Sequence, residues 1–169
     1  MLTVTTALFA WLTMLYVLVI LWDARHYIIP NWLNLLILAS YPLMLLVGWP
    51  EPWWGGLAAF AAMLGFGLIL FFLGIMGGGD VKLLAVSMLW TGWTLTSMYF
   101  LVYTALVGGV LAILVVIVRR LVMPLLVKLS PDRSIARIWK RGEPIPYGLA
   151  IAGAFLGLLY LNKMPGLML

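Results

Sequence analysis

The sequence has no cysteine, a single histidine, and only five acidic and ten basic residues among its 169. Without cysteine, the chain cannot form disulfides, thiolate metal sites or a cysteine nucleophile. His26 and a few scattered carboxylates are a poor ligand set for zinc, so we expect no metal and no other cofactor. A serine–histidine site would depend on His26, which we expect to be exposed beside an apolar segment.

Apolar residues are abundant instead: 66% of the chain is hydrophobic, and the mean hydropathy is +1.17. A soluble domain of this size cannot bury so many apolar side chains, because a large share of its residues must face water. Runs of about 20 apolar residues are long enough to cross a bilayer. We therefore predict an all-α, polytopic protein of the lipid bilayer.

Glycine and proline breaks divide the chain into about six predicted transmembrane helices within one membrane domain, residues 1–169. These helices are expected at residues 2–22, 31–47, 56–76, 81–95, 97–118 and 146–161. The apolar stretch from 81 to 118 is too long for one span at about 1.5 Å per residue, and Thr91-Gly92-Trp93 is the natural division. The first segment lacks the basic start and cleavage site of a signal peptide, so we expect a retained span.

The basic residues indicate how these helices are oriented. With the amino terminus outside, every lysine and arginine except Lys163 falls on the cytoplasmic side of an inner membrane. The net charge of +5 is thereby assigned to topology, and no nucleic acid is expected as a partner. The basic cytoplasmic loop at 119–145 could also bind anionic lipid or a partner protein, although setting the topology is sufficient to explain it.

Two of the five acidic residues lie where an apolar helix meets the predicted cytoplasmic face. Glu51, Asp132 and Glu143 fall in loops, whereas Asp23 and Asp80 occupy these helix ends. Ionisable groups at such positions are costly and therefore indicate function. The structural alternative is that each aspartate only marks a helix end, where a neighbouring basic residue pairs with it.

Gly77, Gly78 and Gly79 directly precede Asp80. Glycine weakens a helix by about 1 kcal/mol relative to alanine and admits backbone angles that other residues avoid. The three glycines should therefore unwind the chain or let another backbone approach closely. Irregular backbone at membrane depth is tolerated only beside protein or water, so these residues predict an irregular, hydrated pocket around Asp80. A tight glycine-rich turn is the alternative, although such a turn does not require an aspartate.

Two carboxyl groups held a few ångströms apart do not both ionise easily, so one keeps its proton while the other acts as a base. Such a pair activates water against a peptide carbonyl and protonates the leaving amine. Asp23 and Asp80 are therefore candidate catalytic residues of an aspartic protease that needs no metal.

Three motifs resemble those of the type IV prepilin peptidases, membrane proteases with a GxGD signature. Gly77-Gly78-Gly79-Asp80 fits that signature and is followed by Val81-Lys82. Asp23 with Ile29-Pro30-Asn31 is similar to the element in which an aspartate closes the first span and IPN opens the second. Ile145-Pro146-Tyr147-Gly148 is similar to the proline–aromatic–glycine element before the last helix.

The resemblance implies an aspartic endopeptidase that removes the leader of type IV prepilins or pseudopilins at the cytoplasmic face, just before their hydrophobic helix. Asp23 and Asp80 would be the catalytic pair. Residues that shape the site would be Gly77, Gly78, Gly79, Lys82, Pro30, Asn31, Pro146, Tyr147 and Gly148. We expect Lys82 to act electrostatically or by orienting other groups, and Asn31 to cap the second helix.

Among the family's forms, the chain looks like the short, peptidase-only type of Flp (tight-adherence) pili. The paired cysteines of the larger, bifunctional members are missing, as is their amino-terminal segment, so we expect no N-methyltransferase activity. The precursor's hydrophobic segment is expected to pack between the spans. The alternatives are a small transporter or channel that relays protons or cations through the two carboxylates, and a structural assembly subunit. The oligomeric state stays open.

Overall fold

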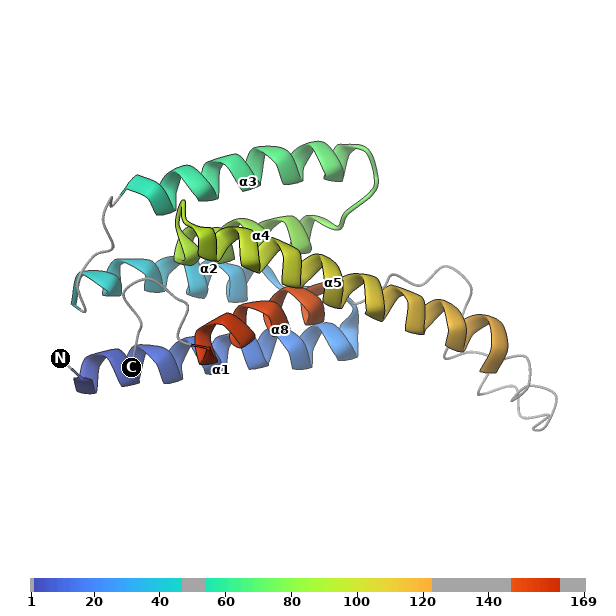
Figure 1. The fold of residues 1–169 in the computed structure, drawn as a ribbon, viewed down its shortest axis with the longest axis horizontal. Helices are drawn as coiled ribbons and strands as arrows, with labels where there is room; N and C mark the ends of the chain where they lie inside the picture. The colour runs from blue at the N-terminus through green and yellow to red at the C-terminus, as the bar shows by residue number, and fades with distance from the viewer. Residues whose placement is uncertain (1, 47–53, 123–146, 162–169) are drawn as a thin grey trace.

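The computed structural model describes residues 2–46, 54–122 and 147–161, and these are almost entirely helical (Figure 1). No strand occurs within these ranges. In the described part of the chain, the helices long and apolar enough to cross a membrane lie at Val4–His26, Trp54–Phe72 and Leu95–Ile117, with a shorter apolar helix at Tyr147–Tyr160. The predicted all-α, polytopic class is therefore confirmed. Most of the basic loop at 119–145 lies outside the described residues.

Short connections join successive helices along most of the chain. The bounds of the helices are α1 Leu2–His26, α2 Asn31–Ser40, η1 Tyr41–Leu46, α3 Trp54–Phe72, α4 Gly78–Thr91, α5 Leu95–Ile117, η2 Val118–Val122 and α8 Tyr147–Tyr160. η1 is a 3₁₀ helix that continues α2, and η2 is a π-helical turn that continues α5. The change to 3₁₀ geometry coincides with Pro42, which cannot donate the backbone hydrogen bond of an α-helix.

Tyr27 and Pro30 set the connection between α1 and α2. Tyr27 adopts a left-handed conformation with φ of 55°, and its N–H donates to the carbonyl oxygen of Asp23 at 2.8 Å. Pro30 is extended, and α2 begins at the next residue. α1 thus continues to His26, past the boundary expected at residue 22, because nothing breaks the helix earlier. Asp23 consequently lies in the last turn of α1 rather than beyond its end.

The long apolar stretch divides at Gly92, between α4 and α5. Gly92 has a φ of 68°, a conformation that favours glycine, and α4 ends at the preceding residue. Thr94 then begins the next helix, since its side chain accepts a hydrogen bond from the N–H of Thr96 at 3.1 Å. The division therefore falls at the Thr91-Gly92-Trp93 segment that the sequence analysis selected.

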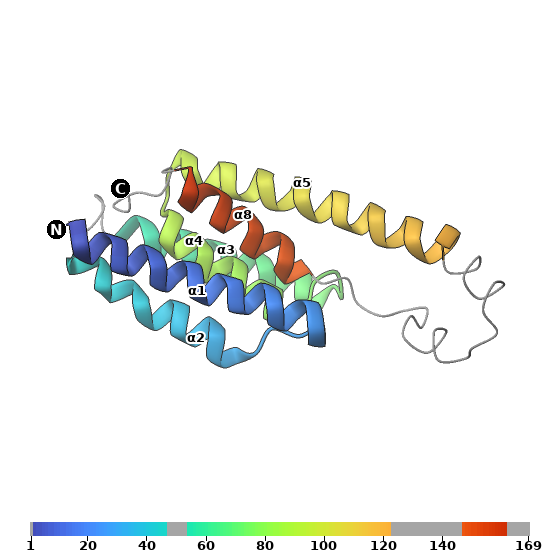
Figure 2. The same cartoon turned by 90° about the horizontal axis from the view of Figure 1, so that it is seen from below.

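α4 is the central helix of the bundle (Figures 1 and 2). From Val81 to Thr91 all of its residues except Lys82 are buried, as expected of a helix covered by protein on all sides. α3 packs along α4, which also contacts α2, α5 and α8. α1 lies beside α8 and α2, and α8 also contacts α5. The start of α4 is thereby enclosed by helices from both halves of the chain.

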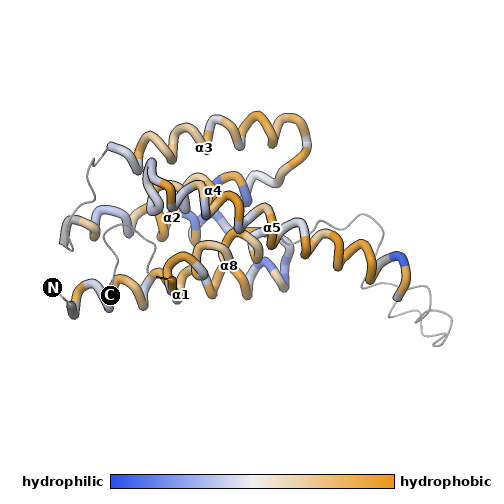
Figure 3. Tube along the Cα trace, in the orientation of Figure 1, coloured by the Kyte–Doolittle hydropathy of each residue, from blue (hydrophilic) through white to orange (hydrophobic). Residues whose placement is uncertain are grey.

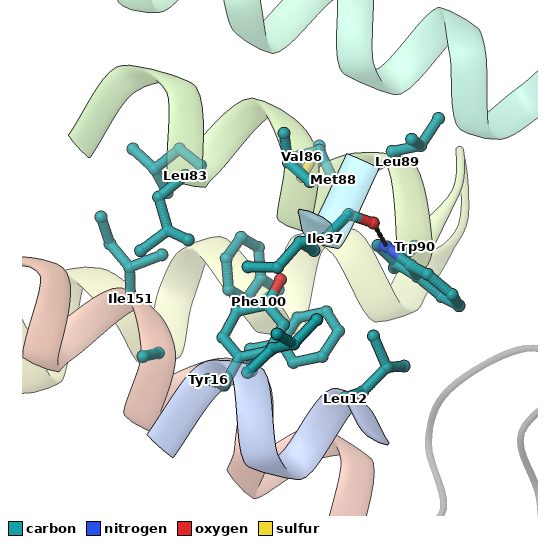
Figure 4. Close-up of a cluster of buried hydrophobic side chains, with 14 of the residues drawn as sticks. Leu12, Tyr16, Ile37, Leu83, Val86, Met88, Leu89, Trp90, Phe100 and Ile151 are labelled. Carbon is teal, nitrogen blue, oxygen red and sulfur yellow. Dashed lines mark hydrogen bonds between the residues drawn. The ribbon is translucent and has the colours of Figure 1, made fainter. Parts of the chain in front are cut away.

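Polar groups in the centre of the bundle are bonded to one another (Figure 4). Tyr16 and Ser87 share a hydrogen bond of 2.8 Å between their hydroxyl oxygens, and Trp90 Nε1 donates to the carbonyl oxygen of Ile37 at 3.3 Å. The ring of Tyr16 also stacks on that of Phe155, with centroids 3.9 Å apart. These contacts join α1, α2, α4 and α8 while satisfying polar atoms that have no access to water.

α3 and α5 consist mostly of apolar residues (Figure 3), and many of these side chains are exposed. Phe66, Phe72, Leu95 and Leu106 are all more than half exposed. A contiguous apolar surface of this kind is unfavourable in water and suits contact with lipid chains. The outer surface therefore agrees with the membrane environment that composition indicates.

Small residues let α3 approach α4 closely. The buried face of α3 includes Gly56, Ala59 and Gly67. A Cβ atom added at Gly67 would lie 2.6 Å from Val81 Cγ1, and one added at Gly56 would lie 2.6 Å from the carbonyl oxygen of Leu89. Such small residues are typical of membrane helices whose backbones pack closely.

Gly56→Ala should destabilise the protein, whereas Gly65→Ala in the same helix should not. The added methyl group at Gly56 would meet backbone in α4, while one at Gly65 would meet no heavy atom within 4 Å. Overpacking of this kind costs about 1–3 kcal/mol. Thermal unfolding of both variants in detergent micelles checks this. Equal unfolding temperatures would show that α4 is not held at this distance.

Candidate active site

Asp23 lies in the last turn of α1 and faces the beginning of α8. Its side chain is 3% exposed, and its Oδ2 accepts a hydrogen bond from the backbone N–H of Leu149 at 3.2 Å. Leu149 belongs to the first turn of α8, where backbone N–H groups have no partner within the helix and the helix dipole favours negative charge. The buried carboxylate of Asp23 thus has a hydrogen-bond donor, the N–H of Leu149, and lies in the favourable electric field of the start of α8.

Gly148 makes this approach possible. A Cβ atom at this position would lie 2.8 Å from Asp23 Oδ2 and 2.7 Å from Ile29 Cδ1. No side chain fits between the backbone of α8 and these two residues, so glycine is required by space and not by backbone angle. Tyr147, the first residue of α8, packs against Gly108 of α5, whereas Pro146 lies outside the described residues.

Asp80 occupies the first turn of α4, and its carboxyl group lies over the backbone of Gly77. A Cβ atom at Gly77 would be 3.0 Å from Asp80 Oδ2. Gly77 is extended and directly precedes the helix, but Gly78 and Gly79 are helical. Of the two expectations for these glycines, close approach of another backbone holds at Gly79, where a Cβ atom would lie 3.3 Å from the Ile29 carbonyl oxygen, and unwinding holds for neither Gly78 nor Gly79. They continue the helix because its hydrogen bonds begin at once, with the N–H of Val81 donating to the carbonyl oxygen of Gly77 at 3.1 Å.

Ile29 links the two acidic helix ends. Its side chain is 5% exposed. A Cβ atom on Gly79 would lie 3.2 Å from Ile29 Cβ and 3.3 Å from the Ile29 carbonyl oxygen, and the other end of the side chain meets Gly148. Ile29 therefore touches the glycine before Asp80 and the glycine beside Asp23. From the sequence alone Ile29 is only part of a motif; its signal is an apolar residue directly before proline in a short connection.

The two carboxyl groups interact electrostatically. Burial and, to a lesser degree, the negative charge of Asp23 together raise the pKa of Asp80 to about 7, although a hydrogen bond from the backbone of Gly77 opposes the shift. Asp80 lies outside the three helices long enough to cross the membrane. Near neutral pH the site can therefore hold one protonated and one ionised carboxyl group, which is the state required of an acid–base pair.

Lys82 and Asn31 form a second polar group beside Asp80. Lys82 Nζ donates to Asn31 Oδ1 at 2.8 Å, and both side chains are exposed. The expectation that Asn31 caps the second helix is wrong: Pro30 occupies the cap position, no side chain bonds there, and Asn31 turns to α4 instead. Asn34, which the sequence analysis missed, donates from Nδ2 to the carbonyl oxygen of Gly79 at a long 3.5 Å.

The site therefore gathers the end of α1 and the beginnings of α2, α4 and α8 at one end of the bundle (Figures 1 and 2). The predicted site residues found there are Asp23, Pro30, Asn31, Gly77, Gly78, Gly79, Asp80, Lys82, Tyr147 and Gly148. Within the described ranges, no cluster of three or more His, Cys, Asp or Glu residues could hold a metal ion. The arrangement offers paired carboxyl groups, backbone donors and one lysine.

A family model described as the type IV leader peptidase family matches residues 6–113, which is more than half of the chain. The matched region contains both aspartates, Lys82 and Asn31. No curated protein and no solved structure matches the chain.

Asp80→Asn should raise the unfolding temperature at pH 8 and have no such effect at pH 4. The unfolded chain ionises Asp80 above its ordinary pKa near 4, whereas the folded protein keeps the proton up to about pH 7. Folding is therefore progressively disfavoured between these two values, and asparagine removes this cost. Thermal unfolding of both proteins across this pH range checks the sign. A stabilisation that does not change with pH would contradict the raised pKa of Asp80.

Proposed function

The chain belongs to the type IV leader peptidase family, and we propose that it is an aspartic endopeptidase that cuts the leader from type IV prepilins or pseudopilins. The observation that carries this proposal is the meeting of Asp23 and Asp80 at one end of the bundle. The charge of Asp23 raises the pKa of Asp80. Ile29 touches both Gly79, which precedes Asp80, and Gly148, which lies against Asp23. Nothing about a structural subunit would require two carboxyl groups in this arrangement.

In the proposed reaction, the ionised carboxylate accepts a proton from water while the water oxygen bonds to the carbonyl carbon of the peptide. The other carboxyl group gives its proton to the peptide nitrogen, and the C–N bond then breaks. The leader gains a new carboxyl terminus, and the pilin gains a new amino terminus. One proton is taken up and one is released, so the pair ends with its protonation exchanged and needs only one proton shift to reset.

The proposed location is the inner membrane, with the site at the cytoplasmic face. Arg25 and Lys82 each follow a site aspartate by two residues, so positive charge accompanies the site itself. Arg120 lies exposed in η2, at the end of α5 that extends past the site end of the bundle (Figure 1). Basic residues collect on the cytoplasmic side of membrane proteins, which favours this orientation.

Flp-type precursors are the proposed substrates, with peptide cleavage as the only activity. This part of the proposal rests on the resemblance to the short family members and on the absence of cysteine from the chain. The transporter alternative is less well supported, because relay carboxylates are expected near the middle of the membrane in broken helices. Here Asp80 lies at the first turn of α4 and Asp23 at the last turn of α1.

Asp23→Asn and Asp80→Asn should each abolish cleavage of a pilin precursor, with a loss on the order of 10⁴-fold. Each variant removes one member of the acid–base pair while keeping the size of the side chain. Glu51→Gln makes the same change at an acidic residue that the proposal does not use, and this variant should retain full activity. The measurement is the appearance of the shortened pilin after incubation with the purified protein in detergent or nanodiscs.

The two possible failures have different meanings. Cleavage by the Asp80→Asn enzyme at the wild-type rate would end the aspartic mechanism while leaving the peptidase activity in place. A wild-type protein that folds but leaves several pilin precursors intact would contradict the proposed substrate class.

A further inference from the structure

A lateral groove lies beside the site, between α2 and α3. Both helices pack against α4, which forms the floor between them. The groove encloses about 530 Å³. Its walls consist of Asn34, Leu35 and Leu38 from α2, Phe60 and Leu64 from α3, and Val86 from α4. Lys82 and Asn31 lie at the end of this α2–α3 groove that is nearer to Asp80.

The shape of the groove suits a helix. Leu35 and Leu38 stand about one turn apart on α2, as do Phe60 and Leu64 on α3. Rows of side chains with this spacing form the ridges and grooves in which another helix packs. The walls are apolar along these rows, so the helix that fits must itself be apolar.

The polar end of the groove indicates which part of a helix lies there. Asn34 is 5% exposed and lines the groove, and its Oδ1 has no hydrogen-bond partner among the described residues. A buried acceptor without a partner is unfavourable. The first N–H groups of any α-helix lack partners within the helix, so the amino-terminal end of a bound helix would bring free donors beside this amide, which could turn toward them. A lipid chain has no such donor.

We propose that the α2–α3 groove binds the apolar helix of the pilin precursor, with its amino-terminal end at Asn34 and Lys82. This inference rests on the proposed function, because the leader is cut just before that helix. The polarity agrees: Lys82, which follows Asp80 by two residues in the first turns of α4, lies at one end of the groove, and the apolar walls lead away from it. The ammonium group of Lys82 would bind main-chain carbonyl oxygens of the extended segment at the cut.

Filling the groove should weaken precursor binding without harming the chemistry. Leu64→Trp places a large side chain in the groove, whereas Ile69→Trp adds the same side chain to α3 at a position that is 58% exposed and outside the groove lining. With a synthetic precursor containing leader and apolar segment, Leu64→Trp should raise KM at least about tenfold and leave kcat nearly unchanged. A short peptide that ends soon after the cut should be processed equally by all three proteins.

A second measurement does not depend on activity. In the Asp80→Asn protein, a benzophenone amino acid at position 64 should crosslink to the same precursor, and one at position 69 should not. Crosslinks from position 64 to phospholipid alone, with the precursor present, would overturn the inference. An unchanged KM for the Leu64→Trp enzyme, with folding verified by its unfolding temperature, would also overturn it while leaving the peptidase function intact. If the wild-type protein does not cut the precursor at all, the proposed function fails, and this inference fails with it.

Discussion

The contact of Ile29 with two glycine backbones holds the geometry of the candidate site. Ile29 lies between Gly79 of α4 and Gly148 of α8, and neither position has room for a side chain without displacing it. The two aspartates reside on helices that do not share a loop, so their approach depends on this shared neighbour. A single buried side chain therefore couples the end of α1, the start of α4 and the start of α8.

Helix ends make two acidic groups tolerable at the edge of an apolar bundle. Burial alone disfavours a charged carboxylate, and a membrane protein cannot rely on water within its apolar part. Here each carboxyl group meets the beginning of a helix, where free N–H groups and the helix dipole stabilise negative charge. Asp23, in the last turn of α1, faces the start of α8, and Asp80 lies in the first turn of α4. The compensation is partial, since burial still raises the pKa of Asp80 to about 7. This incomplete compensation leaves a proton available for chemistry near neutral pH.

The sequence was sufficient for the fold class and for selecting residues that the fold brings to one end of the bundle, because amino-acid composition and helix-breaking residues carry that information. The apolar runs, the break at Gly92 and the two isolated aspartates are all local features of the chain. What could not be predicted depends on packing across the bundle. The partner of Asn31 is Lys82, which is remote in sequence, and the helical state of Gly78 and Gly79 follows from α4 beginning directly after Gly77. Periodicity does not encode such contacts.

The same packing explains why the space between α2 and α3 is open toward the site and closed at the level of the last turn of α4. Tyr41, at the start of η1, contacts Gly56 of α3 and meets Trp90 of α4 edge to face, with ring centroids 5.4 Å apart. Through these contacts the end of α2 packs against both α3 and α4, at the level of the last turn of α4. Nearer to Asp80, α2 and α3 instead lie on opposite sides of the α2–α3 groove, and Lys82 and Asn31 lie at this end of it. The proposed cleavage of a pilin precursor would use this lateral opening, because a precursor helix held in the bilayer would have to approach Asp23 and Asp80 from the side.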